Sequence, residues 1–244
     1  AAESHVDRSV HNSRIFVETN VVGTQTLLDQ ALALGLPRFV HISTDEVYGS
    51  IDSGSWDENE PLLPNSPYSA SKAASDLLVR SYFVTHGLNA SITRCSNNYG
   101  PHHFPEKVIP LFVTNLLDGH TVPLYGDGLN VRDWLHVDDH CRGISLVLQK
   151  GQPGEIYNIG GGTELPNTEL TDLLLAPTDR DKSFVTAVRD RKGHDRRYSV
   201  DISKISHDLG YQPQVGFTSG LADVVQWYRD NRQWWEPLKE RAGL

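Results

Sequence analysis

The sequence predicts an α/β fold built on a parallel sheet, because helical and strand patterns alternate along its first hundred residues. Residues 14–35 have the apolar spacing of a helix and end on a glycine, and residues 66–87 repeat this pattern with a proline near the start. Residues 38–44 and 89–96 are short, mostly apolar runs that are typical of buried strands. The order helix, strand, helix, strand indicates a parallel sheet with helices on its faces.

The pattern changes after residue 100, where proline, glycine and histidine become frequent and the predicted elements become shorter. The clearest of these elements are a helix at 107–119, strand ends at 155–162 and 196–201, and a closing helix at 220–235. We therefore expect residues 1–100 to form the sheet and residues 101–244 to form mainly a smaller, irregular α/β lobe.

The composition is that of an ordinary globular protein, with 244 residues, 38% hydrophobic and 22% charged. The net charge of −9 argues against nucleic acid or an anionic membrane as a partner. No apolar run approaches the roughly 20 residues of a membrane span, and no signal peptide is visible. We interpret Cys95 and Cys141 as buried free thiols in a reducing compartment, with a disulfide as the alternative.

Two neighbouring acids, Asp45 and Glu46, follow Thr44 directly at the end of a predicted buried strand. In open α/β sheets, ligands bind beyond the carboxyl ends of the strands. Removing water from adjacent carbons requires a base for the carbon-bound proton and an acid for the departing hydroxyl. Two carboxylates in unlike environments can divide those roles. The alternative interpretation is a helix cap or turn cluster without chemistry.

Tyr68 and Lys72 stand four residues apart on a predicted helix and so share one face. An ammonium group near a phenol favours the phenolate and lowers a pKa that is ordinarily about 10. Such a tyrosine can take a proton from a sugar hydroxyl while hydride leaves the same carbon. The alternative is a tyrosine and a lysine on a solvated helix face.

A basic segment at 189–197 stands out in this acidic chain and could pair with phosphate; the alternative is a solvated charged loop. Histidine pairs at 102–103 and at His136 and His140 lack the spacing or cysteine partners of a known metal motif. We therefore expect no metal site.

Several segments together resemble one family. They are ETNVVGTQTLL, HISTDEVYG, YSASKAASDLLVRSY, SNNYGPHHFPEKVIPL, VRDWLHVDDH and DRKGHDRRYSVD. These resemble the nucleotide-sugar 4,6-dehydratases, which belong to the extended short-chain dehydrogenase/reductases, and the likeness runs along nearly the whole chain. It implies a Rossmann-like doubly wound parallel sheet that binds NAD in residues 1–100, and a lobe that binds a nucleotide sugar in 101–244. Part of 131–160 would return to the sheet.

The resemblance also implies roles for the candidate catalytic residues. Tyr68 would be the base at the sugar C4 hydroxyl, while NAD accepts the C4 hydride. Glu46 would remove the C5 proton and Asp45 would protonate the departing C6 hydroxyl. Thr44 would hold a sugar hydroxyl, and Lys72 would also contact the nicotinamide ribose. Hydride returned to C6 would complete a 4-keto-6-deoxy sugar.

Binding residues follow from the same resemblance. Contacts to NAD are expected from Ala2, Ser4, Thr19, Tyr68, Lys72 and Asn98. Contacts to the nucleotide sugar, with dTDP-glucose as the expected substrate, are implied for Ser4, Thr44, Asn97, Lys107, Val108, Pro123, Tyr125, Arg132, Asn167, Arg191 and His194. The resemblance further implies a cytoplasmic homodimer in which the helices at 14–35 and 66–87 pair across a two-fold axis.

Three other interpretations stay open at this point. A nucleotide-sugar 4-epimerase would share the fold, Tyr68 and Lys72, but that family usually has small hydroxyl or apolar residues in place of Asp45 and Glu46. A dinucleotide sensor without catalytic activity would tend to lose Tyr68 or Lys72. The family's opening strands and Gly-rich phosphate loop do not occur here, so we expect this stretch alone to bind NAD poorly and to be marginally folded, or inert.

Overall fold

The computed structural model describes residues 2–243, and its central feature is a parallel sheet. The sheet has the order β1-β2-β6, with β1 at Phe39–Thr44, β2 at Ala90–Cys95 and β6 at Ile156–Ile159. All of its pairings are parallel, with Thr44 opposite Cys95 at one end. The predicted α/β class with a Rossmann-like parallel sheet is therefore confirmed.

The remaining strands form two smaller sheets. One has the order β3-β5-β7 and the other pairs β4 with β8 in parallel. Their bounds are β3 (Asn97–Tyr99), β4 (Val122–Tyr125), β5 (Val131–His136), β7 (Glu164–Pro166) and β8 (Val185–Val188). The strand end predicted at 196–201 forms only isolated bridges, from Arg197 to Val131 and from Val200 to Trp56.

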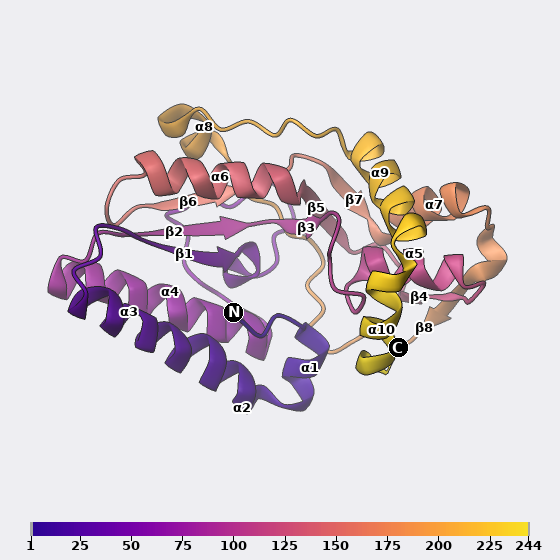
Figure 1. The fold of residues 1–244 in the computed structure, drawn as a ribbon, viewed down its shortest axis with the longest axis horizontal. Helices are drawn as coiled ribbons and strands as arrows, with labels where there is room; N and C mark the ends of the chain where they lie inside the picture. Colours follow the sequence, from indigo (N-terminus) through magenta and orange to yellow (C-terminus); the bar gives the residue numbers. More distant parts are fainter. Residues whose placement is uncertain (1, 244) are drawn as a thin grey trace.

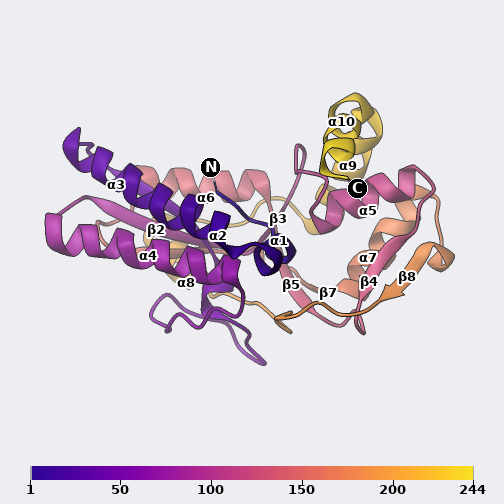
Figure 2. The same ribbon diagram turned by 90° about the horizontal axis from the view of Figure 1, so that it is seen from below.

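Helices cover both faces of the central sheet and pack around the two smaller sheets (Figure 1). In chain order the helical segments are α1 (Val6–His11), α2 (Ser13–Phe16), η1 (Val17–Val22), α3 (Gly23–Ala33), η2 (Asp45–Tyr48), α4 (Pro67–His86), α5 (Val108–Leu117), α6 (Val137–Lys150), α7 (Asn167–Leu175), η3 (Ala176–Thr178), η4 (Lys182–Phe184), α8 (Ser203–Leu209), α9 (Phe217–Asp230) and α10 (Arg232–Ala242). α3 and α4 lie side by side on one face of the sheet, and α6 lies on the other (Figures 1 and 2). Among residues 2–243, no helix is both long and apolar enough to cross a lipid bilayer.

α4, which carries Tyr68 and Lys72, has strong start and stop signals in the sequence. The Ser66 hydroxyl accepts a hydrogen bond from the Ser69 backbone N–H, and the Ser69 hydroxyl accepts one from the Ser66 backbone N–H. The two residues therefore form a capping box. Pro67 occupies the first helical position, where its missing N–H is not needed. Gly87 ends the helix with a φ of 68°, which a residue without Cβ adopts readily. These local signals fix the position of α4 along the chain.

The helix predicted at 14–35 forms at 13–33, but a π-helical stretch, η1, interrupts it. Asn20 lies in this stretch with its side chain buried. Its amide donates to the Ser71 hydroxyl of α4 and to the Glu3 carbonyl, and the Ser75 hydroxyl donates to the Asn20 carbonyl. The wider π turn therefore ties this helix to α4 by polar contacts, and π-bulges are often found at functional sites.

Apolar side chains form one large cluster around α5, α7 and α9 and smaller clusters elsewhere. The large cluster includes Trp134 and Trp235 and joins α5, α7 and α9.

Two features differ from the sequence-based expectation. The closing helix predicted at 220–235 is two helices, α9 and α10, that meet at Asn231. The prediction of two buried thiols is wrong for Cys141, which is exposed on α6, whereas Cys95 is half-buried; neither forms a disulfide.

Candidate functional site

The predicted acid pair lies at the carboxyl end of β1, where the chain turns into η2. Thr44 caps η2, because its hydroxyl accepts a hydrogen bond of 3.3 Å from the Glu46 backbone, and it also donates to the Asp45 carboxyl at 3.2 Å. The other carboxyl oxygen of Asp45 is buried and has no hydrogen-bond partner among residues 2–243. The cap is therefore Thr44 and not one of the two acids, and one oxygen of Asp45 has no partner among residues 2–243.

The two acids have unlike electrostatic surroundings. Burial, and after it the charge of Glu46, raises the pKa of Asp45 well above its ordinary value. Burial also raises the pKa of Glu46. The next largest influences on Glu46 are the positive charges of Arg132, Arg191 and Lys107, which lower its pKa. Both carboxyls therefore hold a proton more strongly than free carboxyls do, Asp45 more so than Glu46, and three neighbouring cations oppose the increase at Glu46. Such a difference in surroundings can divide an acid role from a base role.

Tyr68 and Lys72 are buried at the first turns of α4, so the interpretation as a solvated helix face is wrong. The Lys72 ammonium donates a 2.7 Å hydrogen bond to the Ile42 carbonyl of β1. The Tyr68 ring packs edge-on against Phe16, with ring centroids 6.3 Å apart. Lys72 therefore lies against β1, and the influence of Glu46, Thr44 and Asp45 on the pKa of Tyr68 places that phenol near the acid pair.

The pKa of Tyr68 differs from the sequence-based expectation. Burial raises it well above its ordinary value, the charge of Glu46 raises it further, and Thr44 partly opposes the increase. Burial lowers the pKa of Lys72, with Asp76 opposing. The expected lowering of the Tyr68 pKa by Lys72 is therefore not seen, because burial and the nearby carboxyls outweigh it.

Three cations that are distant in the sequence, Lys107, Arg132 and Arg191, act on the pKa of Glu46. Lys107 donates to the Ser4 carbonyl at 2.5 Å. Arg132 is buried, donates to the Asp195 carbonyl at 2.9 Å, and lies over the Tyr198 ring at 4.2 Å. These contacts hold two of the predicted nucleotide-sugar residues, Lys107 and Arg132, in fixed positions.

The basic segment at 189–197 divides into two kinds of residue. Arg191 turns toward α1, with its guanidinium 3.5 Å from the Asp7 carboxylate, and its charge acts on Glu46. Arg196 pairs with Asp127 and Arg197 with Glu164. Arg191 is thus the member of the segment whose charge lowers the pKa of Glu46, and its contact with phosphate stays a prediction. Arg196 is half-exposed and fits the charged-loop interpretation.

The other predicted contacts differ in how closely the structure ties them to the acid pair. Tyr125 and His194 pack edge to face at 6.4 Å, and His194 also bonds to Asp190 at 2.6 Å. Asn98 bonds to the buried His140 of α6 at 2.8 Å. Within the described part of the chain, no direct hydrogen bond or ion pair joins Asp45, Glu46, Tyr68 or Lys72 to the remaining members, which are Ala2, Thr19, Asn97, Val108, Pro123 and Asn167.

A bound dinucleotide fits the polar groups at this edge of the sheet. The Ser96 hydroxyl and the Asn97 side-chain oxygen follow β2, and neither has a hydrogen-bond partner among residues 2–243. Lys72 is a buried cation whose charge acts on Cys95, the residue before Ser96. Dinucleotides bind outside the carboxyl ends of parallel strands, where such groups are available. In contrast, no group of three metal-binding side chains occurs in residues 2–243.

Five buried polar residues lie behind the acid pair, and no sequence motif identified them. They are His41, Tyr48, Asp76, Arg94 and Asn158. Asp76 stands one helical turn beyond Lys72, at the same four-residue spacing that separates Tyr68 from Lys72. This spacing is the one sequence signal that could have indicated Asp76.

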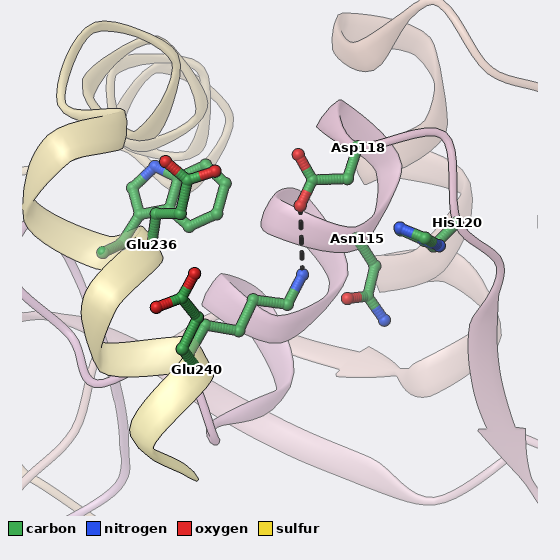
Figure 3. A pocket seen from close by; sticks show the side chains of 7 residues that line it. Asn115, Asp118, His120, Glu236 and Glu240 are labelled. Atoms are coloured by element: carbon green, nitrogen blue, oxygen red, sulfur yellow. Dashed lines mark hydrogen bonds and ion pairs between the residues drawn. The ribbon is translucent and has the colours of Figure 1, made fainter. Parts of the chain in front are cut away.

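A cavity of about 380 Å³ between α5 and α10 lies apart from this chemistry (Figure 3). Asp118 and Lys239 form an ion pair at 3.4 Å across it. Its lining contains none of the predicted residues; it consists of Asn115, Asp118, His120, Trp235, Glu236, Lys239 and Glu240.

Comparison with known proteins places the chain among sugar-nucleotide enzymes. The family model described as GDP-mannose 4,6 dehydratase matches residues 1–224. A dTDP-glucose 4,6-dehydratase of Streptomyces antibioticus is 65% identical over 243 residues, which are 100% of this chain and 72% of that protein.

Solved structures agree with this placement. DesIV, a dTDP-glucose 4,6-dehydratase from Streptomyces venezuelae solved with NAD and TYD bound, is similar with a TM-score of 0.97 and 66% identity, covering 98% of this chain and 74% of that one. UDP-glucose 4-epimerase from Thermotoga maritima is similar with a TM-score of 0.90 and 31% identity, covering 95% and 76%.

Proposed function

This chain belongs to the dTDP-glucose 4,6-dehydratases, within the GDP-mannose 4,6 dehydratase family, and we propose that Asp45, Glu46, Tyr68 and Lys72 are its catalytic residues. The enzyme is an NAD-dependent hydro-lyase. The expected substrate is dTDP-glucose and the expected product is dTDP-4-keto-6-deoxyglucose. The proposal assigns a separate proton transfer to each of three residues.

Tyr68 accepts the proton of the sugar C4 hydroxyl as C4 is oxidised. Glu46 then removes the proton from C5, which the new 4-keto group has made acidic. Asp45 donates a proton to the C6 hydroxyl, which leaves as water. Bound NAD would accept the hydride from C4 and return it to C6, and the proton that Glu46 removed would return to C5, so the net change is the loss of one water. Lys72 holds positive charge beside the phenol, and Thr44 orients a sugar hydroxyl.

The observation that carries this proposal is the difference between the two neighbouring carboxyls. Asp45 is buried beside the charge of Glu46, and both effects raise its pKa well above the ordinary value. Burial also raises the pKa of Glu46, but the positive charges of Arg132, Arg191 and Lys107 oppose that increase. An acid and a base at adjacent positions are what an elimination requires, and the assignment follows from these surroundings.

We propose that the same cations bind the nucleotide diphosphate. Guanidinium groups pair bidentately with phosphate, and Arg191 and Arg132 lie beside the acid pair. The further proposed contacts to the nucleotide sugar are Ser4, Asn97, Lys107, Val108, Pro123, Tyr125, Asn167 and His194. Those proposed for NAD are Ala2, Ser4, Thr19, Tyr68, Lys72 and Asn98.

The rival function is a nucleotide-sugar 4-epimerase, because an epimerase structure shares this fold. An epimerase needs Tyr68 and Lys72 but has no use for an acid and a base at positions 45 and 46. The test is to incubate the full gene product that carries this sequence with NAD and dTDP-glucose. We expect a product that has lost one water, detected by mass spectrometry. A product of unchanged mass with inverted C4 would establish the epimerase instead.

We also propose that the enzyme is a homodimer that pairs through the helices at 13–33 and 67–86. These helices carry the exposed apolar side chains Ile15, Val22, Leu77 and Val84, which are 43–62% exposed. Closed two-fold dimers are the commonest soluble assembly. The pairing would remove these side chains from water.

Leu77→Glu is expected to convert this dimer to a monomer, because it places a charge at the centre of the exposed apolar stripe on α4. Light scattering at micromolar protein measures the change. The matched control is Leu148→Glu, on α6 at the opposite face of the sheet, where the leucine is also exposed, at 51%. Wild-type protein that scatters as a monomer, or loss of the dimer in the control, would contradict the proposed interface.

A further inference from the structure

A buried arginine on β2 contacts both segments that carry the proposed catalytic residues. Arg94 is 3% exposed. Its Nε donates to the Asp76 carboxylate of α4 at 2.9 Å, and its Nη1 donates to the Tyr48 hydroxyl of η2 at 2.8 Å. α4 carries Tyr68 and Lys72, and η2 begins with the two acids. One rigid side chain therefore joins the two segments from behind the site.

The partners of Arg94 are themselves buried and fixed. Asp76 is 2% exposed and Tyr48 is 1% exposed. The Tyr48 hydroxyl donates onward to Asn158 of β6 at 2.9 Å, and the Arg94 guanidinium also lies 4.7 Å from the centre of the Tyr48 ring. Tyr48 stands two residues after Glu46, and Asp76 stands one helical turn after Lys72. Each partner of Arg94 therefore lies within one helical turn of a proposed catalytic residue, Glu46 or Lys72.

Packing alone does not account for a charge at this position. Removing an ion from water is expensive, and a buried ion pair is often replaceable by apolar side chains without loss of stability. Arginine differs from lysine and from apolar residues in offering several donors in a fixed plane, so it can hold two partners at a set separation. An arginine can therefore fix the position of one segment relative to another by donating to both.

We propose that Arg94 is a positioning residue that sets η2 and α4 relative to each other, so that the acid pair and Tyr68 meet the same sugar. The inference rests on the proposed function, because it concerns the two halves of that reaction. The Tyr48 contact positions the elimination residues Asp45 and Glu46. The Asp76 contact positions Lys72 and Tyr68, which act in the oxidation at C4.

Single-turnover kinetics separate the two contacts, because NADH absorbance rises as C4 is oxidised and decays as elimination is completed. Tyr48→Phe removes the hydroxyl but keeps the ring, and it is expected to slow the decay by about 10- to 100-fold with the rise almost unchanged. Asp76→Asn is expected to slow the rise by a similar factor, about 10- to 100-fold. Arg94→Lys keeps the charge but cannot hold both partners, so it should slow both phases.

A second measurement does not depend on turnover. In the protein without NAD, hydrogen–deuterium exchange of Tyr48→Phe should rise in peptides covering residues 44–49 and stay unchanged in α4. The matched control is Tyr157→Phe, a fully buried tyrosine of β6 whose hydroxyl accepts from the Gln152 backbone at 3.0 Å. This control should leave both kinetic phases and the exchange of residues 44–49 as in the wild type.

The outcomes are distinct. Equal slowing of both phases by Tyr48→Phe and Asp76→Asn, or no slowing by either, would overturn the positioning role, since loss of stability alone lowers the active fraction and not the rate constants. If Arg94→Lys fails to fold, the other two variants still decide. A wild-type enzyme that shows neither phase with dTDP-glucose would instead refute the proposed function.

Discussion

Tyr68→Phe is expected to slow hydride transfer from C4 by about 10²–10⁴-fold, because it removes the group that accepts the hydroxyl proton. The fold should persist, since phenylalanine keeps the ring that packs against Phe16. The measurement is the single-turnover rise of NADH absorbance with dTDP-glucose. A variant within a few-fold of the wild type would rule out Tyr68 as the base.

The pH dependence gives this prediction a second test. Burial and the charge of Glu46 raise the pKa of Tyr68, so the reactive phenolate becomes more abundant as pH rises. The wild-type rate of hydride transfer should therefore increase with pH, and the Tyr68→Phe rate should lose this dependence. The matched control is Tyr82→Phe on the same helix, where the hydroxyl bonds to Asp29 at the outer face. The control should keep both the rate and its rise with pH.

Glu46→Gln is expected to abolish product formation while leaving the first hydride transfer intact. Glutamine keeps the size of the side chain but cannot take the C5 proton, and loss of a general base slows a step by about 10²–10⁴-fold. NADH absorbance should therefore rise at nearly the wild-type rate and then persist. Normal formation of the keto-deoxy product by this variant would contradict the assignment of Glu46 as the C5 base.

Asp45→Asn is the informative companion, because the two acids have different roles in the proposal. With Glu46 intact, the C5 proton should still exchange with deuterium from solvent, although water leaves C6 slowly. In Glu46→Gln, C5 exchange should be lost. If both variants lose C5 exchange equally, the division of roles between the neighbouring carboxyls is wrong, even if both residues are needed for activity.

The sequence by itself determined the elements that carry the site. Ser66, Pro67 and Gly87 place α4, because caps and stops act through hydrogen bonds and dihedral angles within a few residues. The four-residue spacing of Tyr68 and Lys72 places them on one helix face, since the helical period is local. The end of the apolar run at Thr44 likewise places the acid pair at a strand end. The family resemblance added the reaction to these positions.

Only the tertiary structure decided how those groups are tuned and held. The unlike surroundings of Asp45 and Glu46 depend on Lys107, Arg132 and Arg191, which lie far along the chain from the acid pair. No local pattern encodes such proximity, because charges act through space and the fold sets their distances. For the same reason, the contact of Arg94 with Asp76 and Tyr48 cannot be predicted from the sequence. The apolar pattern predicts a helix around Asn20 but does not distinguish a π turn from an α-helix. The sequence thus specifies which groups reach the strand end, and packing between distant segments specifies which proton each of them can hold.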